Sequence, residues 1–243
     1  MESESQTVII SGGMGDVGKA IATKLSADGF KIYLLYNRTS KTEVDMFIAS
    51  LSGNGHTSYK VDVTNEKEVF DVVKKINKID ICIHCAVSPI IRKSALNITR
   101  AEFRQQFEVT AFGGLTLFQA VAAHMKINRS GKIIGLTSEV LKKDSIASGM
   151  TGYLCAKEAL QGILRDLSKE LSNFNISVNA ISPSFIPSSL NNDLPEAIIS
   201  FITERSQTNS LDEVAKLASY LCLSKVFVTG ISYKVGSEEK TPL

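Results

Sequence analysis

The chain has 243 residues, of which 44% are hydrophobic and 21% are charged, so it can bury a sizeable core in one α/β domain. Its formal net charge is +2, and basic residues are interspersed with acidic ones, which argues against binding to nucleic acid or to a membrane surface. The polar, acidic start of the chain and the lack of an apolar run of membrane-spanning length favour a cytoplasmic protein. We expect a single domain over 1–243 whose partners are small molecules or proteins.

The first part of the chain predicts a strand, a glycine-rich turn and a helix. Residues 7–10 are mostly β-branched and apolar, as in a buried parallel strand, and 19–29 has helical spacing and ends in glycine. Between them stands Gly13-x-Gly15-x-x-Gly18, which lets the chain turn sharply and lets the backbone approach a pyrophosphate at a helix N-terminus. The same pattern also fits an ordinary turn, but its place at the first strand favours a dinucleotide site.

Asp16 is the unusual residue of this turn. Its carboxylate can help to cap the helix, yet it would repel a pyrophosphate if it faced one. We therefore expect the Asp16 side chain to point away from the bound phosphates.

The end of the second predicted strand, 31–36, selects between the two nicotinamide cofactors. Folds that prefer NAD place an acidic residue here for the ribose 2′-hydroxyl, whereas an arginine accommodates a 2′-phosphate. This chain has Tyr36 followed by Arg38, with hydroxyl groups at Thr39 and Ser40. The sequence therefore predicts NADP (NADPH), the alternative being that Arg38 is a solvated loop residue.

The remaining elements alternate in type and predict a Rossmann-like, doubly wound parallel sheet of about seven strands with helices on both faces. Ligands of such sheets bind beyond the carboxyl ends of the strands. The irregular segment 183–210, which contains three prolines, is the expected substrate lid. Helices are predicted over 41–52, 66–76, 99–126, 152–173 and 211–223, and strands over 57–61, 79–84, 131–137, 176–181 and 231–235.

Two further patterns concern the core. Within the predicted helix 99–126, the pair Gly113-Gly114 allows a kink or close packing. The four cysteines, at 82, 85, 155 and 222, are expected to be reduced thiols. Cys82 and Cys85 lie three apart on a predicted strand and so point to opposite faces, which predicts core positions and no metal site.

Tyr153 and Lys157 stand four apart at the start of the helix after the fifth strand, so they share one helix face. A nearby ammonium group is expected to lower the pKa of the Tyr153 phenol and so to suit it to proton transfer with a carbonyl oxygen. Ser138, at the end of the fifth strand, is placed to hydrogen-bond the same oxygen. Alone, a tyrosine and a lysine at this spacing are common in helices; their order after the glycine turn and Ser138 makes the pattern more specific.

Taken together, these motifs resemble the short-chain dehydrogenase/reductase family over nearly the full length, and within it the reductases of 3-oxoacyl thioesters. The resemblance implies a catalytic unit of Ser138, Tyr153 and Lys157, with Lys157 also binding the nicotinamide ribose. The matching pieces are SGGMGDVG (11–18), YNRTS (36–40), DVT (62–64), TS (137–138), YLCAK (153–157), SVNAISPSFI (177–186) and VTGISYKVG (228–236). The implied cofactor-binding set is Gly12, Gly13, Gly15, Asp16, Val17, Gly18, Asn37, Arg38, Thr39, Asp62, Val63, Cys85, Ala86, Tyr153, Lys157, Pro183, Ile186 and Ser188.

The chain departs from the family pattern at several positions. The usual Asn-Asn-Ala-Gly after the fourth strand is replaced by residues 84–87, His-Cys-Ala-Val, and the usual Pro-Gly by Pro183-Ser184. The glycine turn is more similar to the GGxGxxG pattern of polyketide ketoreductase domains than to the commoner glycine spacing of the family. Thr110 stands where many members have an asparagine that anchors a proton-relay water, and its hydroxyl is the group expected to hold that water. His84 is expected to be structural.

The resemblance implies an NADPH-dependent ketoreductase acting on a 3-oxoacyl thioester or a related polyketide or fatty-acyl intermediate, with Tyr153 as the proton donor. Arg129 fits one position at which such enzymes dock acyl carrier protein, while the other position is Phe174. The alternatives are a dehydrogenase of a sugar or small alcohol, and a catalytically weak NADP-binding regulatory or scaffold protein. A homotetramer or homodimer, paired through the helices 99–126 and 152–173 and the last strand, is expected.

Overall fold

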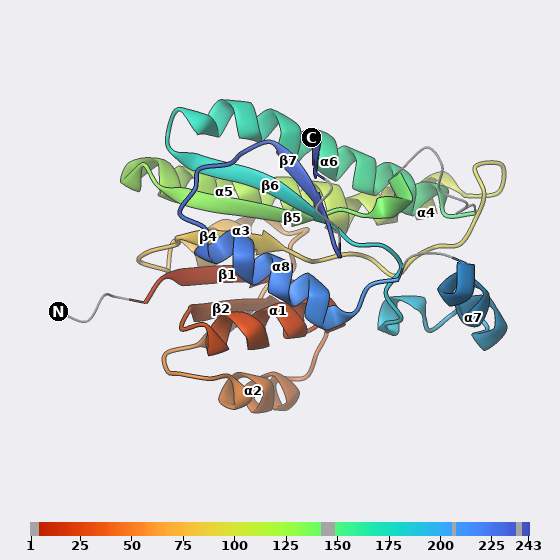
Figure 1. Ribbon diagram of the computed structural model, residues 1–243, viewed down its shortest axis with the longest axis horizontal. Helices are drawn as coiled ribbons and strands as arrows, with labels where there is room; N and C mark the ends of the chain where they lie inside the picture. The colour runs from red at the N-terminus through yellow and green to blue at the C-terminus, as the bar shows by residue number, and fades with distance from the viewer. Residues whose placement is uncertain (1–4, 142–148, 206–207, 237–239) are drawn as a thin grey trace.

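One continuous sheet organises the computed structural model, which describes residues 5–141, 149–205, 208–236 and 240–243 (Figure 1). In these residues the strand order is β3-β2-β1-β4-β5-β6-β7-β8, with β1 to β7 parallel and β8 antiparallel to β7. The strands are β1 (Thr7–Ser11), β2 (Lys31–Tyr36), β3 (Thr57–Lys60), β4 (Ile81–His84), β5 (Gly131–Leu136), β6 (Ile176–Ser182), β7 (Ile231–Lys234) and β8 (Lys240–Pro242). The doubly wound parallel sheet is thus confirmed, with β8 as an addition.

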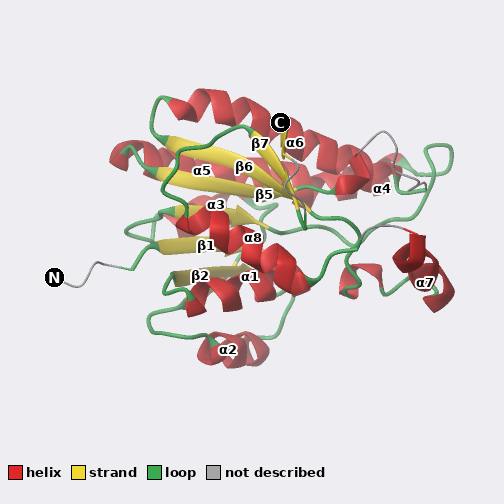
Figure 2. Ribbon diagram, viewed as in Figure 1, coloured by secondary structure: helices red, strands yellow, loops and turns green. Residues whose placement is uncertain are grey.

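The helices lie on both faces of the sheet (Figure 2). None of the described helices is both long and apolar enough to cross a membrane. The α-helices are α1 (Asp16–Ala27), α2 (Lys41–Ser50), α3 (Glu66–Val73), α4 (Arg100–Phe107), α5 (Gly113–Asn128), α6 (Thr151–Ser172), α7 (Glu196–Arg205) and α8 (Leu211–Leu223). Short π and 3-10 turns occupy Glu108–Phe112, Glu139–Leu141 and Ser189–Asn191.

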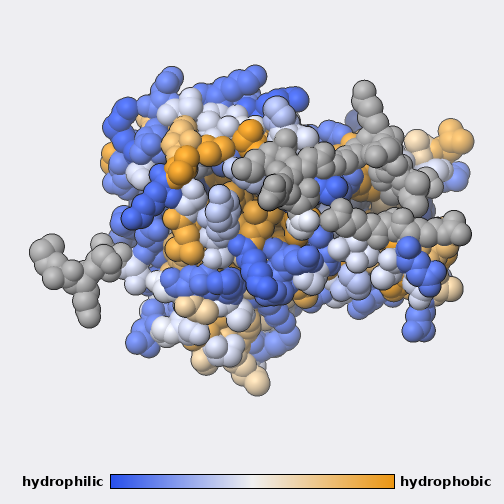
Figure 3. All heavy atoms as spheres, in the orientation of Figure 1, coloured by the Kyte–Doolittle hydropathy of each residue, from blue (hydrophilic) through white to orange (hydrophobic). Residues whose placement is uncertain are grey.

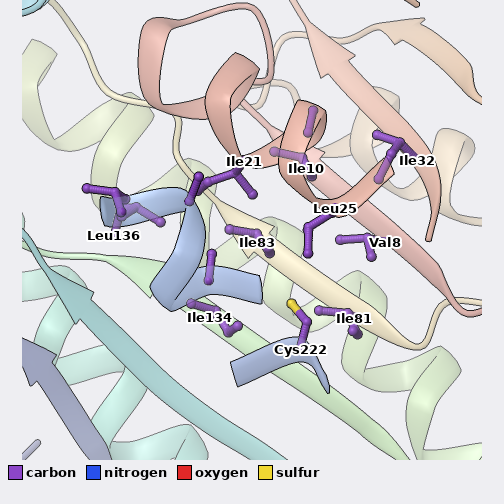
Figure 4. Close-up of a cluster of buried hydrophobic side chains, with 14 of the residues drawn as sticks. Val8, Ile10, Ile21, Leu25, Ile32, Ile81, Ile83, Ile134, Leu136 and Cys222 are labelled. Atoms are coloured by element: carbon purple, nitrogen blue, oxygen red, sulfur yellow. The ribbon is translucent and has the colours of Figure 1, made fainter. Parts of the chain in front are cut away.

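Two clusters of buried side chains fill the space between the sheet and its two helix layers. Along β1, Val8 and Ile10 face α1 and α8, whereas Ile9 faces α3, α5 and α6, as the two-residue period of a strand requires. Figure 4 shows Ile21 and Leu25 of α1 in the cluster that also contains Val8 and Ile10. This is why apolar residues stand at consecutive positions in the middle of β1.

The cysteines take the expected positions as free thiols. Cys82 belongs to the cluster under α5 and α6, whereas Cys85 packs against the cluster under α1 and α8. No group of side chains in the described residues could hold a metal ion.

Three helices differ from the sequence expectation. Helix α1 begins at Asp16 rather than at residue 19, and α7 forms inside the segment that was expected to be irregular. The helix expected over 99–126 is divided into α4, a π turn and α5. The Gly113-Gly114 pair follows the π turn and packs closely: a Cβ added at Gly113 would lie 2.7 Å from a methyl carbon of Val63. Helix α5 can therefore approach the segment that follows β3.

Candidate active site

The turn between β1 and α1 forms the floor of the candidate site. Gly12 has a φ of +65°, and a Cβ added there would lie 2.6 Å from the backbone nitrogen of Ala86, in the segment after β4. A Cβ at Gly18 would lie 2.3 Å from the carbonyl oxygen of Gly12. Gly13, the first glycine of the predicted pattern, packs on Leu34 of β2. The turn role belongs to Gly12, because only glycine adopts this φ without strain in so little space.

A cavity of about 700 Å³ lies above this turn, beyond the carboxyl ends of β1 to β4. It stands where the strand order reverses between β1 and β4, the usual ligand position in a doubly wound sheet. The expected residues that line it are Gly12, Gly15, Asp16, Val17, Gly18, Asn37, Arg38, Thr39, Asp62, Val63, Cys85, Ala86 and Ser188. The other expected cofactor residues, which do not line it, are Gly13, Tyr153, Lys157, Pro183 and Ile186.

Asp16 is one of the residues that line the cavity, and the expectation that its carboxylate points away from bound phosphates stays a prediction. It is the first residue of α1 after the N-cap Gly15. Its Oδ2 accepts a hydrogen bond of 2.6 Å from the backbone N–H of Ser189, 173 residues along the chain. The carboxylate thus ties the glycine turn to the segment after β6, a contact that no local sequence pattern could predict.

Asn37, Arg38 and Asp62 meet at the ends of β2 and β3. Burial alone would raise the pKa of Asp62, but hydrogen bonds from Thr64 and Asn37 and the charge of Arg38 outweigh it and hold the pKa below its ordinary value. The Asp62 carboxylate accepts bonds of 2.9 Å and 2.7 Å from the backbone N–H and hydroxyl of Thr64. This end of the cavity therefore combines a fixed carboxylate with a guanidinium group.

Ser138, Tyr153 and Lys157 lie together at the carboxyl end of β5. The Tyr153 phenol is hydrogen-bonded to Ser138. The Lys157 ammonium is buried, donates a bond of 2.6 Å to the carbonyl oxygen of Leu136, and lies 5.8 Å from the centre of the Tyr153 ring. One turn of α6 separates the phenol from the ammonium, as the four-residue spacing requires.

The pKa values in this cluster differ from the sequence expectation. Burial raises the pKa of Tyr153, and the Ser138 hydrogen bond and the charge of Arg92 only partly offset that rise. The expected lowering by Lys157 is therefore wrong in this structure, because desolvation of the phenolate dominates. Burial lowers the pKa of Lys157 itself to about 8, with an opposing effect of Cys85. The phenol is thus firmly protonated at neutral pH.

Thr110 lies in the π turn beside this cluster, and its backbone carbonyl is engaged by His84. His84 Nε2 lies 3.1 Å from the Thr110 carbonyl oxygen, and Nδ1 lies 2.7 Å from the Ser11 hydroxyl. Burial lowers the pKa of His84 to about 3, and the charge of Lys157 adds to this effect. A neutral imidazole then donates from Nε2 to the carbonyl and accepts at Nδ1 from the hydroxyl.

The segment after β6 and the segment after β4 meet above the cavity. The Pro183 carbonyl accepts a bond of 2.9 Å from the Glu139 N–H, and Ile186 is buried.

Sequence reasoning missed Arg92, which pairs with Asp193. The signal available was a basic residue in a loop at the carboxyl end of the sheet; its partner, 101 residues away, gave none. Residues 206–207 of the expected lid lie outside the described residues.

Known proteins share this architecture and these motifs. A family model described as enoyl-(acyl carrier protein) reductase matches residues 14–236. A 3-oxoacyl-[acyl-carrier-protein] reductase of Synechocystis sp. is 28% identical over 95% of both chains. Two solved structures, each 20% identical, share the fold: ElxO with NADP bound (TM-score 0.83, 96% of this chain and 97% of that one) and NAD⁺-bound xylitol dehydrogenase (TM-score 0.82, 98% and 100%). The chain belongs to the short-chain dehydrogenase/reductase family of oxidoreductases, which bind nicotinamide cofactors, and within it is similar to the 3-oxoacyl-[acyl-carrier-protein] reductases.

Proposed function

We propose that the protein is a single-domain, cytoplasmic, NADPH-dependent ketoreductase that converts a ketone into a secondary alcohol. The observation that carries the proposal is the buried cluster of Tyr153, Ser138 and Lys157 at the same edge of the sheet as the glycine-floored cavity. A protonated phenol beside a serine hydroxyl provides two donors for one carbonyl oxygen.

Each residue of the cluster has a distinct proposed role. A bound NADPH supplies the hydride for the carbonyl carbon. Ser138 orients the carbonyl oxygen, and Tyr153 transfers its phenolic proton to that oxygen as negative charge develops there. Lys157, with a pKa of about 8, holds the nicotinamide ribose and is placed to return a proton to Tyr153. The Thr110 hydroxyl is proposed to hold a relay water, since the Thr110 carbonyl is engaged by His84.

The residues around the cavity fit a dinucleotide. The glycine turn packs closely on backbone atoms at Gly12 and Gly18, where a Cβ would clash, and the N-terminus of α1 offers backbone N–H groups to a pyrophosphate. Asp62 is proposed to contact the adenine, and Pro183, Ile186 and Ser188 to close over the nicotinamide. The segment 183–210 is proposed to act as the substrate lid.

Arg38 is the proposed selector of NADPH over NADH, and the Arg38→Gln variant tests this role. The fold alone does not decide the matter, since one structural neighbour is titled with NADP and another with NAD⁺. A charge-assisted contact to a 2′-phosphate contributes about 1.5–3 kcal/mol. We therefore expect about a 10- to 100-fold loss of NADPH affinity with little change for NADH, measured by fluorescence titration. An equal loss for both cofactors would show that Arg38 has no role in selection.

The proposed substrate is a 3-oxoacyl thioester or a related polyketide or fatty-acyl intermediate, free or carried by a protein. The reductase of Synechocystis supports this class. Near the start of β5, Lys126 and Arg129 lie over the Phe174 ring, 5.0 Å and 5.7 Å from its centre, and form a basic surface that suits an acidic carrier protein. A sugar or small alcohol remains the rival substrate class.

Turnover with acetoacetyl thioesters, followed through the NADPH absorbance, tests the enzyme proposal. Cofactor binding without turnover on a broad panel of ketones and alcohols would instead favour a regulatory or scaffold protein that binds NADP. The specific observation behind that rival is Asp16, an acidic residue among those that line the cavity where a pyrophosphate is proposed to bind.

A homotetramer or homodimer is proposed from an apolar patch beside the last parallel strand. The patch consists of residues at the end of α8 and just after it, Tyr220, Leu223, Val226 and Phe227, which are 47–72% exposed. Figure 3 shows apolar atoms gathered over this segment. Monomers rarely expose a contiguous patch of this kind. Light scattering is expected to give a dimer or tetramer that Val226→Asp shifts to smaller species, while Met46→Asp, at an exposed position on α2, does not. A monomeric wild-type protein would contradict the proposal.

A further inference from the structure

We propose that Arg92 makes the enzyme selective for ketones that carry a carboxylate, by binding that carboxylate in a guanidinium fork beside the reacting carbonyl. The inference rests on the proposed ketoreductase function, and it assigns to the substrate a free carboxylate in place of the thioester group that similarity to the 3-oxoacyl-[acyl-carrier-protein] reductases suggests. Arg92 lies between β4 and α4, in a segment to which the sequence pattern assigned no role.

The fork already holds a carboxylate within the protein. Arg92 Nε donates a bond of 2.7 Å to one carboxylate oxygen of Asp193, and Nη2 donates a bond of 3.2 Å to the other. This two-point geometry is the one in which arginine recognises a planar carboxylate. Asp193 lines the cavity, so its carboxylate marks a position that a ligand there can reach.

The guanidinium is held independently of Asp193. Nη2 also donates a bond of 2.9 Å to the side-chain oxygen of Asn191, which is buried and donates in turn to the Ile186 carbonyl at 3.0 Å. The Arg92 side chain is only 23% exposed, whereas that of Asp193 is 50% exposed. Asp193 is therefore the partner that a substrate carboxylate can replace, since an exposed ion pair contributes little stability.

The fork also lies beside the start of α6, the helix that carries Tyr153. Arg92 Nη1 donates to Met150 Sδ at 3.1 Å, and Met150 immediately precedes α6, three residues before Tyr153. The adjacent Lys93 carbonyl accepts a bond of 3.3 Å from the Thr151 N–H, which fixes this segment on the start of α6. The charge of Arg92 acts on the Tyr153 phenol, where it opposes the rise in pKa caused by burial.

The simpler alternative is that the Arg92–Asp193 pair only fastens the segment after β6 to the segment after β4. A fastening role affects all substrates alike, because it changes the lid and not the contact with one substrate group. Selectivity between an acid and its ester separates the two roles. The acid and its ester enter the same cavity, so a difference in kcat/KM between them reports mainly on the carboxylate charge.

The experiment compares 2-, 3- and 4-oxo acids with their methyl esters as substrates of the full-length enzyme with NADPH. For at least one chain length, we expect kcat/KM for the acid to exceed that for the ester by tenfold or more. In Arg92→Gln the loss for that acid should exceed the loss for its ester by tenfold or more, mainly through KM. Asp193→Asn should lower KM for the acid, because the fork loses its internal carboxylate. Arg100→Gln, at an exposed position in the first turn of α4, is the control for loss of a positive charge.

Each outcome has a defined meaning. If Arg92→Gln lowered kcat/KM equally for the acid and the ester, and Asp193→Asn lowered both by the same factor, only the fastening role would remain. That result would overturn the inference. If the wild-type protein binds NADPH but reduces none of the ketones, the proposed function fails first. Thermal unfolding of each variant shows whether it is folded, and Arg92→Lys, which keeps the charge but not the fork, should recover only part of the preference for the acid.

Discussion

Replacing Tyr153 by phenylalanine is expected to lower kcat for ketone reduction by about 100- to 10,000-fold, the usual contribution of a positioned proton donor. The substitution removes only the hydroxyl group that is hydrogen-bonded to Ser138, and it keeps the ring that lies 5.8 Å from the Lys157 ammonium. Single-turnover and steady-state rates of NADPH oxidation measure the loss. NADPH affinity should change little, because the cavity that is proposed to hold most of the cofactor lies outside the contacts of the hydroxyl.

Tyr59 provides the matched control, because it lies on β3, where its ring is stacked on that of Tyr33, and it does not line the cavity. Tyr59→Phe removes the same hydroxyl group away from the site and should leave kcat unaltered. If Tyr153→Phe retained wild-type kcat, the phenol would not be the proton donor and the oxidoreductase mechanism proposed here would fail. A loss of NADPH binding as large as the loss of kcat would instead indicate a structural role for the hydroxyl.

The raised pKa of Tyr153 also sets the direction in which the proton moves. Reduction requires the protonated phenol, which persists above neutral pH because burial disfavours the phenolate. Oxidation of an alcohol requires the phenolate, which only alkaline pH supplies in quantity. We therefore expect the proposed reduction to be favoured at neutral pH and the reverse oxidation at high pH, with the Lys157 pKa of about 8 between the two.

The sequence allowed prediction of the features that depend on near neighbours in the chain. The turn between β1 and α1 follows from the apolar run and the glycine spacing after it. The shared helix face of Tyr153 and Lys157 follows from their four-residue spacing. The motif pattern does not show which glycine takes the positive φ: Gly12 does so, whereas Gly13 packs on Leu34 of β2. This difference depends on the contacts of the turn with β2 and with the segment after β4.

Features that join distant segments could not be predicted from one sequence. The bond from Ser189 to Asp16 spans 173 residues, and the Arg92 contact with Asp193 spans 101. The pKa of Tyr153 depends on how deeply α6 is buried, which spacing does not reveal. Each of these contacts adjusts the cavity or its lid, so the parts that decide substrate choice are those that the sequence patterns leave open.

Gly12→Ala is expected to lower the free energy of unfolding by about 2–5 kcal/mol, the sum of placing a side chain at positive φ and of overpacking. The added Cβ would lie 2.6 Å from the backbone nitrogen of Ala86, and backbone atoms of a buried strand end cannot move aside as a flexible side chain can. Gly15→Ala is the matched control: it adds the same methyl group at a φ of −75°, where the closest atom would be 3.4 Å away. Denaturant unfolding of the two variants measures the difference. Equal stability of the two variants would mean that the turn between β1 and α1 has room for a side chain at Gly12. The cavity floor would then lack the close contact with the segment after β4 on which the proposed cofactor site depends.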